Sequence, residues 1–420
     1  MSTTTGTGRL AVLGGPPAFP DGLPLVRPTI EDVPGLAARL TAVLATGLLT
    51  NGPRVRELEE RLADRLDVGH VVAVGSCTAG LMLAYQALGV RGPVVLPSFT
   101  FAASAHAVHW AGGTPTFAEA RESDLTLDPV DAAGVLGRLA AEGRPAAALS
   151  ATHVYGTPAQ TEALAELAAE HGIPLVYDAA HALGSARAGR AVGGFGTVEV
   201  FSLSPTKVMS AGEGGIVATE DAELARAVRI GRDYGNPGSY DCEFPGINAR
   251  MSELHATMAL FSLEHLDARV ARRNELVEVF RAELDGVPGV RIVDPGRGDV
   301  STRKDLTLVV DAQPYGLNAA QLARVLRAEG VDSRHYYAPP IHRQQAYAGL
   351  PSDGVPSDGL PSDGGQQRAL PVTDRLASQV ISPPLWSHMD DEVARRVARL
   401  VVEAGGQATA VREVLVEVPG

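Results

Sequence analysis

The sequence predicts an α/β protein with a mostly parallel sheet of seven strands, followed by a smaller α+β domain. Two observations carry this prediction. Between residues 70 and 220, short β-rich apolar runs alternate with helical patterns, as in a parallel sheet covered by helices. The chain also has 420 residues, which is too long for one small core and suits two domains.

The expected elements follow one another along the chain. Strands of the sheet are expected at 71–74, 94–96, 114–117, 146–151, 174–178, 198–203 and 215–218, and helices at 78–88, 101–111, 129–142 and 159–171. Residues 252–284 form a long amphipathic pattern that leads into the second domain, where we expect a strand at 305–310 and helices at 318–329 and 390–404. The large domain, with the N-terminal segment, is expected to span 1–265 and the small one 266–420.

A PSDG repeat begins at residues 351, 356 and 361. Pro, Ser, Asp and Gly favour turns and cannot bury a core. We therefore expect residues 350–367 to be a mobile insertion outside the functional site.

The composition limits the class of protein. Hydrophobic residues make up 45% and charged residues 20%, and no apolar run approaches the ~20 residues that span a bilayer. The first ten residues do not have the pattern of a signal peptide, and two cysteines, Cys77 and Cys242, cannot form a disulfide framework, so a reducing cytoplasm is expected. The net charge of −13 argues against a nucleic-acid or anionic-membrane surface.

Lysine usage singles out one residue. Of 36 basic residues only Lys207 and Lys304 are lysine, and the other 34 are arginine. Lys207 stands in FSLSPTKVMSAGEGG, where the sixth expected strand ends. A lysine in a confined, partly apolar site loses its proton readily and can attack a carbonyl, which arginine cannot do. Lys207 is therefore a candidate imine-forming lysine.

Two other strand ends carry polar groups. GSCTAGL, with Thr78, leads into a helix and could hold a phosphate on its backbone N–H groups, or be an ordinary capped turn. YDAAHALG holds Asp178 and His181, which could be a site, or a capping carboxylate beside a core histidine. Ligands in such sheets bind at the carboxyl ends of strands. A phosphate cradle, a carboxylate and an imine-forming lysine are together what pyridoxal phosphate requires.

Several motifs occur in an order and spacing that match a known family. They are LTNGPRVRELEERLA, GSCTAGLMLAYQALG, LPSFTFAASAHAV, YDAAHALGSARAGRAVGGFG, FSLSPTKVMSAGEGGIVATED, GINARMSELHATMAL and LPVTDRLASQVISPPL. From residue 49 to the final helix, the chain resembles the DegT/DnrJ/EryC1/StrS aminotransferases. This resemblance implies a pyridoxal-phosphate-dependent transferase of fold type I, like aspartate aminotransferase, acting on keto-sugars or keto-cyclitols.

The resemblance also implies roles for particular residues. Lys207 corresponds to the Schiff-base lysine and proton shuttle, and Asp178 to the partner of the pyridine nitrogen. The other implied cofactor contacts are His181 near the 3-hydroxyl, Phe101 stacked on the ring, and Ser202, Thr78 and the backbone of Cys77 at the phosphate. Asn248 corresponds to an asparagine that reaches the phosphate from the other subunit, which implies a homodimer with composite active sites. No metal is expected.

Further residues are candidates for the substrate site, although each could equally be structural. Arg250 and Glu253 lie beside Asn248 in the sequence, and Tyr336, Tyr337 and His342 could line the entrance. The chain departs from the family pattern at Cys77, where glycine is usual, and at Ser204, where an aromatic residue or histidine is common.

The expected reaction moves an amino group from L-glutamate to a keto-sugar, expected to be nucleotide-linked. A keto-cyclitol acceptor is an alternative. The sugar dehydratases of the family carry histidine at the lysine position, so Lys207 speaks against that chemistry. A non-catalytic regulatory protein would not need Lys207, Asp178 and Thr78 together. Cysteine desulfurase chemistry needs a mobile cysteine, and Cys77 lies in a tight turn.

Overall fold

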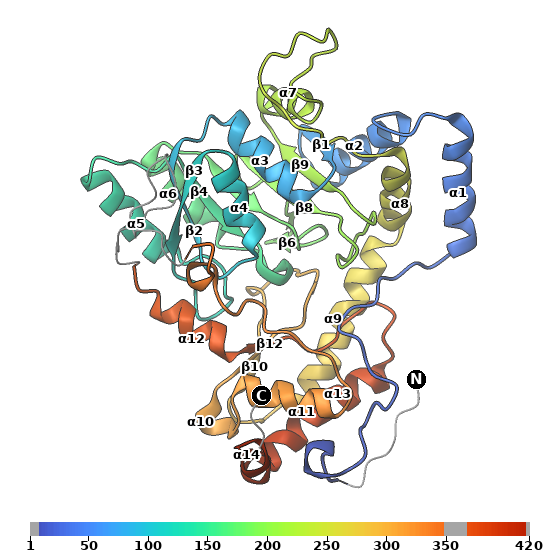
Figure 1. Ribbon diagram of the computed structural model, residues 1–420, viewed down its shortest axis with the longest axis vertical. Coiled ribbons are helices and arrows are strands. Elements are labelled where there is room, and N and C mark those ends of the chain that lie inside the picture. Colours follow the sequence, from blue (N-terminus) through green and yellow to red (C-terminus); the bar gives the residue numbers. More distant parts are fainter. Residues whose placement is uncertain (1–7, 348–367, 417–420) are drawn as a thin grey trace.

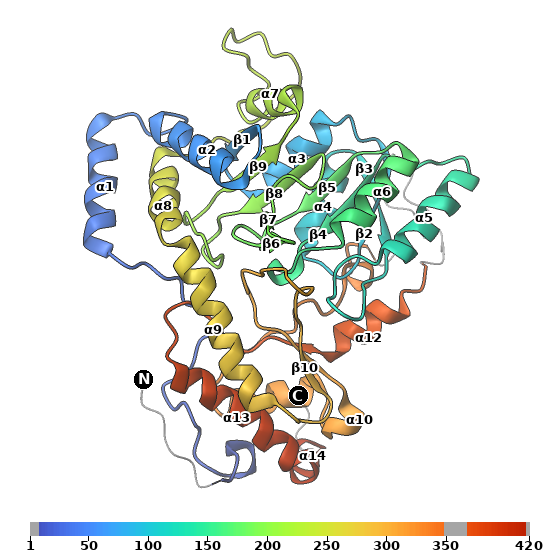
Figure 2. The same cartoon turned by 180° about the vertical axis from the view of Figure 1, so that it is seen from behind.

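The computed structural model describes residues 8–347 and 368–416, so the PSDG repeat lies outside the described residues. Figure 1 shows a large body around a sheet and a smaller body below it, connected by the long helix α9 (Leu266–Leu284). Figure 2 shows the same arrangement from behind. In the part of the chain that is described, no helix combines the length and the apolar character needed to cross a membrane.

The large sheet has seven strands in the order β1-β9-β8-β5-β4-β2-β3. They are β1 (His70–Val74), β2 (Gly92–Pro97), β3 (Gly113–Ala118), β4 (Ala148–Thr152), β5 (Leu175–Asp178), β8 (Val198–Ser202) and β9 (Gly215–Thr219). Strand β9 pairs antiparallel with both of its neighbours, and the other pairings are parallel. The predicted, mostly parallel seven-stranded sheet is therefore confirmed.

Helices cover both faces of this sheet, as Figures 1 and 2 show from opposite sides. One face carries α3 (Cys77–Ala87), α4 (Ala102–Trp110) and α7 (Ala222–Gly231), and the other α2 (Pro53–Leu66), α5 (Pro129–Ala141), α6 (Thr161–His171) and α8 (Glu253–Glu264). The strands are buried on both faces, which explains why they read as nearly continuous apolar runs. The four helices expected between the strands are confirmed. A short hairpin, β6 (Ala186–Arg187) and β7 (Arg190–Ala191), was not predicted.

The amphipathic pattern at 252–284 forms two helices, α8 and α9, that meet at His265. The backbone of His265 has φ −110° and ψ 0°, outside the usual helical range, and this separates the two helices. Leu266 and Val270 of α9 pack in the core of the large body, whereas Leu276 and Phe280 pack in that of the smaller one. The helix thus connects the two cores.

The smaller body contains a three-stranded antiparallel sheet flanked by helices. In chain order its elements are β10 (Val290–Ile292), β11 (Leu308–Val310), α10 (Ala312–Tyr315), α11 (Ala319–Ala328), η3 (Ile341–Arg343), α12 (Pro371–Gln379), β12 (Val380–Ile381), α13 (Asp391–Gly406) and α14 (Ala408–Val416). The expected strand at 305–310 is shorter than predicted, since β11 begins at residue 308. The helix expected at 390–404 is not the last one, because α14 follows it.

The N-terminal segment packs in the core of the smaller body, so its expected place in the large domain was wrong. Leu10, Phe19 and Leu23 are buried in the same apolar cluster as Phe280 and other residues of the smaller body. The carboxylate of Glu329, at the end of α11, accepts hydrogen bonds from the backbone N–H groups of residues 11 and 18. Apart from η1 (Ala11–Leu13), this segment is irregular and gave no periodic pattern that could have predicted its position. The domain boundary at residue 265 itself stays a prediction.

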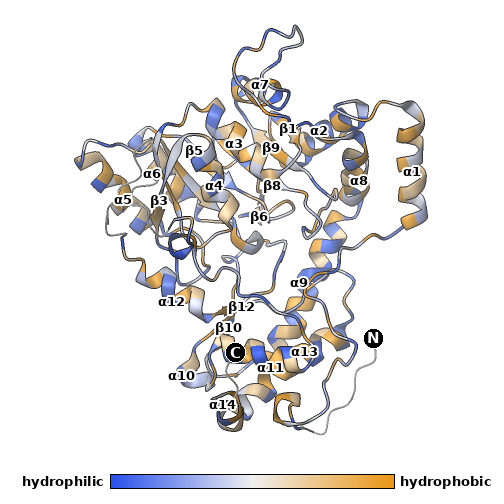
Figure 3. Cartoon of the chain, viewed as in Figure 1, coloured by the Kyte–Doolittle hydropathy of each residue, from blue (hydrophilic) through white to orange (hydrophobic). Residues whose placement is uncertain are grey.

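Helix α1 (Val33–Thr46) lies at the edge of the molecule, beside α8 (Figure 1). Figure 3 shows a large share of apolar residues on it. Val33 is 61% exposed and Leu44 55% exposed, and Leu48 and Leu49 just after the helix are also exposed. An exposed set of large apolar side chains is typical of a contact surface.

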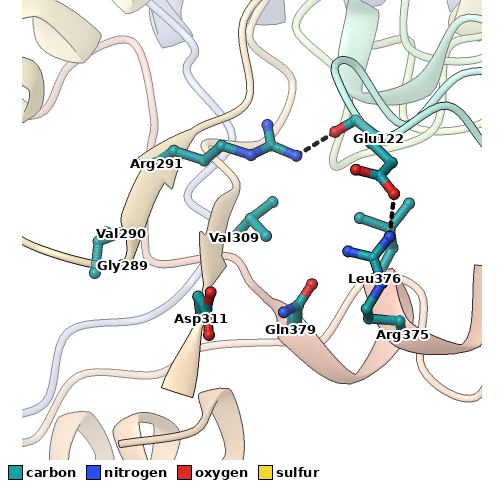
Figure 4. A pocket seen from close by; sticks show the side chains of 9 residues that line it. All are labelled: Glu122, Gly289, Val290, Arg291, Val309, Asp311, Arg375, Leu376 and Gln379. Atoms are coloured by element: carbon teal, nitrogen blue, oxygen red, sulfur yellow. Dashed lines mark hydrogen bonds and ion pairs between the residues drawn. The ribbon is translucent and has the colours of Figure 1, made fainter. Parts of the chain in front are cut away.

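The two bodies also meet at a pocket of about 330 Å³, shown in Figure 4. Glu122, from the loop after β3, is held there by two arginines of the smaller body. Arg291 of β10 donates to its backbone carbonyl, and Arg375 of α12 pairs with its carboxylate. No residue predicted for the functional site lies in this pocket, which we interpret as part of the contact between the bodies.

Candidate active site

The candidate active site is a cavity of about 340 Å³ where strands β1, β2, β5 and β8 end and β9 begins. Two segments of the smaller body, around residues 304 and 336, complete its wall. Nine residues predicted from the sequence line it, namely Cys77, Thr78, Phe101, Asp178, His181, Ser202, Lys207, Tyr336 and Tyr337. The rule that ligands bind at the carboxyl ends of parallel strands therefore predicted the position of this cavity.

Lys207 follows β8 in a turn in which its N–H donates to the carbonyl of Ser204 at 3.0 Å. Burial and the positive charge of Lys304, partly opposed by the charge of Asp305, together lower the pKa of Lys207 to about 8. The amine therefore reaches its nucleophilic, neutral form at a pH much lower than that of a surface lysine.

This shifted pKa predicts the pH dependence of cofactor capture by the apoprotein. Below pH 8 Lys207 is mostly protonated, and above it the free amine can attack an aldehyde. The rate of covalent capture of pyridoxal phosphate should rise through about pH 8 and then level off, whereas an unperturbed lysine would require about pH 10. Stopped-flow absorbance across this range measures it, and a midpoint near that of an ordinary lysine would contradict the assigned environment.

Asp178 ends β5 as a buried carboxylate, 2% exposed. One of its oxygens accepts from the hydroxyl of Ser104 on α4 at 2.5 Å, and the other from the N–H of Ala180 at 3.1 Å. The Ser104 hydroxyl also lies 2.9 Å from that of Thr100. These hydrogen bonds fix the position of the Asp178 carboxylate on the cavity wall.

His181 lies beside this carboxylate with a defined tautomer. Its Nδ1 accepts a hydrogen bond from the backbone N–H of Tyr155 at 3.1 Å, so the proton of the neutral ring is on Nε2. Burial lowers the pKa of His181 well below its usual value, and the charges of Lys207 and Lys304 add to this effect. At neutral pH His181 is therefore an uncharged hydrogen-bond donor.

The far end of the cavity is the N-terminus of α3. Ser76 caps this helix, and its side chain accepts from the N–H of Ala79 at 3.1 Å. The first N–H groups of a helix have no partner within it, and here the hydroxyls of Thr78 and Ser202 lie at the same cavity. At Gly215 a Cβ would lie 2.6 Å from the Cys77 nitrogen, so only glycine allows β9 to pack this closely. This cradle suits a phosphate.

Cys77 contributes a thiol to the cavity floor. Its sulfur lies 3.9 Å from Asp178 Oδ1 and 3.6 Å from the carbonyl oxygen of Val200. Burial raises the pKa of Cys77 well above its usual value, and the charge of Asp178 adds to this effect. The thiol stays protonated, so it lacks the thiolate that cysteine desulfurase chemistry requires.

Aromatic side chains form the wall nearest to solvent. Phe101 is 59% exposed and its ring centroid lies 6.3 Å from that of Tyr337. Tyr337 stacks in turn on Tyr155, with centroids 6.1 Å apart and planes at 5°. Tyr155 also donates a hydrogen bond to the carbonyl of Tyr336. The cavity is thus bordered by flat apolar surfaces that suit an aromatic ring.

The structure adds cavity residues that sequence reasoning missed. They are Ser76, Ala103, Ala180, Thr206, Glu213, Gly214, Lys304 and Asp305, together with Ser204, which the sequence marked only as a departure. A signal for Lys304 was present, because it is the other lysine of the chain. Asp305 had no signal of its own, since it was placed within an expected strand.

Three candidate substrate residues lie outside this cavity. His342 is 2% exposed, so the prediction that it lines the entrance was wrong. Its Nδ1 lies 2.6 Å from the hydroxyl of Ser98, and its Nε2 lies 3.1 Å from Oδ1 of Asp374. These contacts fasten η3 to the end of β2 and to α12, and burial explains the lowered pKa of His342.

Glu253 is also structural, and the prediction of a substrate contact was wrong. It is 2% exposed, and its carboxylate accepts from the backbone N–H groups of Gly52, Arg54 and Val55 at 2.8 to 3.0 Å. These groups begin α2, so Glu253 supplies acceptors that the helix itself lacks.

Replacing Glu253 with Ala should therefore lower the free energy of unfolding by about 2 kcal/mol, since buried N–H groups would lose their acceptor. Urea denaturation measures this change. Glu57→Ala on the exposed face of α2 is the control, because its ion pair with Arg54 is solvent-exposed. Equal stability of the two variants would contradict the capping role.

Arg250 and Asn248 precede α8 and do not line the cavity of their own chain. Arg250 pairs with Asp233, and its guanidinium lies 5.4 Å from the ring centroid of Tyr234. Arg250 does not contact the cavity of its own chain, and a contact with the substrate in another subunit stays a prediction. Asn248 is exposed, and its backbone bridges to Asp233. Its role toward another subunit stays a prediction.

With the geometry established, comparison with known proteins identifies the class. The sequence model of the DegT/DnrJ/EryC1/StrS aminotransferase family matches residues 34–402. A structure of DesI in the presence of its TDP-sugar product has 37% sequence identity to this chain and a TM-score of 0.86, covering 97% of this chain and 98% of that one. The fold is that of pyridoxal-phosphate-dependent transferases of fold type I, and the protein is an aminotransferase.

This chain belongs to the DegT/DnrJ/EryC1/StrS aminotransferase family. The dTDP-3-amino-3,4,6-trideoxy-alpha-D-glucose transaminase of Streptomyces venezuelae is 34% identical over 371 residues, 87% of this chain and 91% of that protein. The erythromycin biosynthesis sensory transduction protein EryC1 of Saccharopolyspora erythraea is 35% identical over 360 residues, 84% of this chain and 91% of that protein.

Proposed function

We propose that this protein transfers the amino group of L-glutamate to the ketone of a nucleotide-linked sugar, with pyridoxal phosphate bound in the cavity. The observation that carries the proposal is that Lys207 and Asp178, at the ends of adjacent strands β8 and β5, line one cavity with the N-terminus of α3. The acceptor class rests on relatives whose names state a dTDP-sugar transaminase and a TDP-sugar product.

The residues present fit this cofactor. Thr78, Ser202 and the first N–H groups of α3 would hold its phosphate. Asp178 would accept a hydrogen bond from its protonated pyridine nitrogen, and the neutral His181 would donate toward its 3-hydroxyl. Phe101 would cover its ring. When bound, the cofactor supplies an electron sink that makes the Cα proton of an amino acid acidic.

Residues of this chain would then transfer that proton. The ε-amine of Lys207, with its pKa lowered to about 8, would take the proton from Cα of the amino acid and return it at a second carbon. Ser104 and Ala180 hold the carboxylate oxygens of Asp178 in place during these steps. Phe101 and Tyr337 limit the access of water from the solvent side.

We further propose that the working unit is a homodimer in which Asn248 reaches the phosphate site of the partner. The exposed apolar side chains of α1 and of Trp110, 73% exposed, support a protein contact. The exposed position of Asn248, outside its own cavity, supports the same arrangement. Sedimentation velocity tests it, since a strictly monomeric, active protein would be inconsistent with a shared site.

The experiment for the reaction is a screen with purified protein, pyridoxal phosphate and L-glutamate. We expect formation of 2-oxoglutarate with one or more dTDP- or UDP-linked keto-sugars. Keto-cyclitols serve as the competing acceptors. If 2-oxoglutarate forms only with them, the acceptor is a keto-cyclitol and not a nucleotide-linked sugar. A protein that yields no 2-oxoglutarate with any acceptor, and does not change its absorbance with any amino donor, would refute the aminotransferase.

A further inference from the structure

The two lysines of this chain lie in one cavity. Lys207 and Lys304 both line it, whereas none of the 34 arginines, all within the described residues, does so. A chain that uses arginine almost everywhere else has thus kept both of its lysines in one place. Lys207 has a chemical reason to be lysine, and Lys304 so far has none.

Lys304 is held firmly at the cavity wall. It is 6% exposed, and its backbone N–H donates to the carbonyl of Tyr155 at 2.9 Å. The buried guanidinium of Arg273 donates to the carbonyls of residues 303 and 304 at 2.8 and 3.2 Å. Two residues earlier, Thr302 donates to the carbonyl of His181 at 2.5 Å. This segment of the smaller body is therefore fixed against the large one at the site.

The ammonium of Lys304 has donor capacity for a ligand. Its Nζ lies 2.7 Å from Oδ1 of Asp305, and both side chains are 5% exposed. An ammonium carries three N–H donors, and Asp305 accepts one of them. A buried ion pair is a weak source of stability, so its place at a cavity wall needs another explanation.

The charge of the ligands supplies that explanation. The amino donor of a transaminase carries a carboxylate on the reacting carbon, whereas the ring of a keto-sugar carries hydroxyl groups. Lys207 is committed to the reaction itself, so Lys304 is the one cation of the described cavity wall that remains for a carboxylate. Binding an anion in a partly dry cavity requires such a partner.

We propose that Lys304 binds the carboxylate of the amino-acid donor, and that Asp305 neutralises Lys304 when the donor has left. This inference rests on the proposed aminotransferase function. Asp305 lines the cavity as well, so it can hold the ammonium in place for the next donor and accept from sugar hydroxyls in the acceptor half of the reaction. One cavity would thereby hold the carboxylate of one substrate and the uncharged sugar ring of the other in turn.

The test compares four cofactor-loaded proteins: wild type, Lys304→Met, Lys304→Arg and the control Arg334→Met. Arg334 is exposed, pairs with Asp332 and does not line the cavity. The dead-end dicarboxylate maleate is titrated by calorimetry, and the glutamate half-reaction is followed by absorbance. Lys304→Met should raise the Kd of maleate and the half-saturating glutamate concentration by at least about tenfold. Lys304→Arg should stay within about threefold of wild type, because it keeps the charge, and Arg334→Met should be unchanged.

The reverse half-reaction, with an amino-sugar as donor, separates binding from a general electrostatic effect. If Lys304 binds the donor carboxylate, Lys304→Met should change the half-saturating amino-sugar concentration by less than about threefold. The inference would be overturned if the half-saturating concentrations of both donors rise equally, or if the pH profile shifts without a change in maleate Kd. Lys304 would then act only through the pKa of Lys207. Maleate binding by Lys304→Met within about twofold of wild type, or no maleate binding by wild type, would also overturn it.

Failure of this inference and failure of the proposed function give different results. If wild type reacts with glutamate and Lys304→Met does so equally well, only the role of Lys304 is refuted. If wild type neither binds pyridoxal phosphate nor reacts with glutamate, the function itself is refuted. Lys304→Arg is the control for misfolding. If both Lys304 variants lose maleate binding and also have a lowered melting temperature, the role of Lys304 is structural and the inference is overturned.

Discussion

Lys207→Ala is expected to lower kcat for amino transfer by at least about 10³-fold, because it removes both the covalent anchor and the group that moves the proton. The residue has no substitute in the cavity. The other lysine there, Lys304, is tied to Asp305 and to the backbone of Tyr155. The measurement is the steady-state rate of 2-oxoglutarate formation from glutamate with a saturating keto-sugar.

Two further variants sharpen this prediction. Lys207→Arg keeps a positive charge but cannot form the covalent bond, so it should be as inactive as Lys207→Ala. Lys304→Met should retain the reducible covalent link to the cofactor, because Lys207 is intact. Activity of Lys207→Ala within about tenfold of wild type would contradict the assigned role.

Asp178→Asn is expected to reduce kcat by about 10² to 10³-fold. An amide cannot supply the negative charge that keeps the pyridine nitrogen protonated, and loss of one partner of a buried ion pair costs about 3–5 kcal/mol. Asparagine preserves the size of the side chain, and its oxygen can still accept from Ser104 or Ala180. The protein should therefore fold and bind pyridoxal phosphate, and kcat with glutamate and keto-sugar reports the loss.

Ser104→Ala is the matched comparison for Asp178→Asn. It removes one donor to the carboxylate but leaves the charge, so a loss of about tenfold is expected. If Asp178→Asn retains wild-type kcat, the carboxylate does not act on the cofactor. If Asp178→Asn fails to fold while Ser104→Ala is unaffected, the role of Asp178 is structural.

Much of the fold could be predicted because the sheet is buried on both faces. Each of its strands left a short apolar run, and the first four runs were each followed by a helical pattern. The site followed from the same pattern, since Asp178 ends a strand and Thr78 and Lys207 lie in turns after strands whose carboxyl ends share one edge of the sheet.

Other features left no local signal. The N-terminal segment packs against the smaller body through single apolar residues without a period. Glu253 was mistaken for a substrate residue because its partners, the N–H groups that begin α2, lie about 200 residues earlier in the chain. Asp305 enters the cavity only because β11 starts later than the apolar pattern suggested. Such contacts depend on tertiary packing and cannot be derived from spacing.

The central claim is that Lys207 carries pyridoxal phosphate, and the chain allows a direct test of it. The holoenzyme is reduced with borohydride, digested and mapped by mass spectrometry. Only two lysines and the α-amine can be labelled. We predict a stoichiometric pyridoxyl group on Lys207, and its loss when glutamate is added before reduction. Label on Lys304 with Lys207 unmodified, or no label on either lysine, would contradict the account.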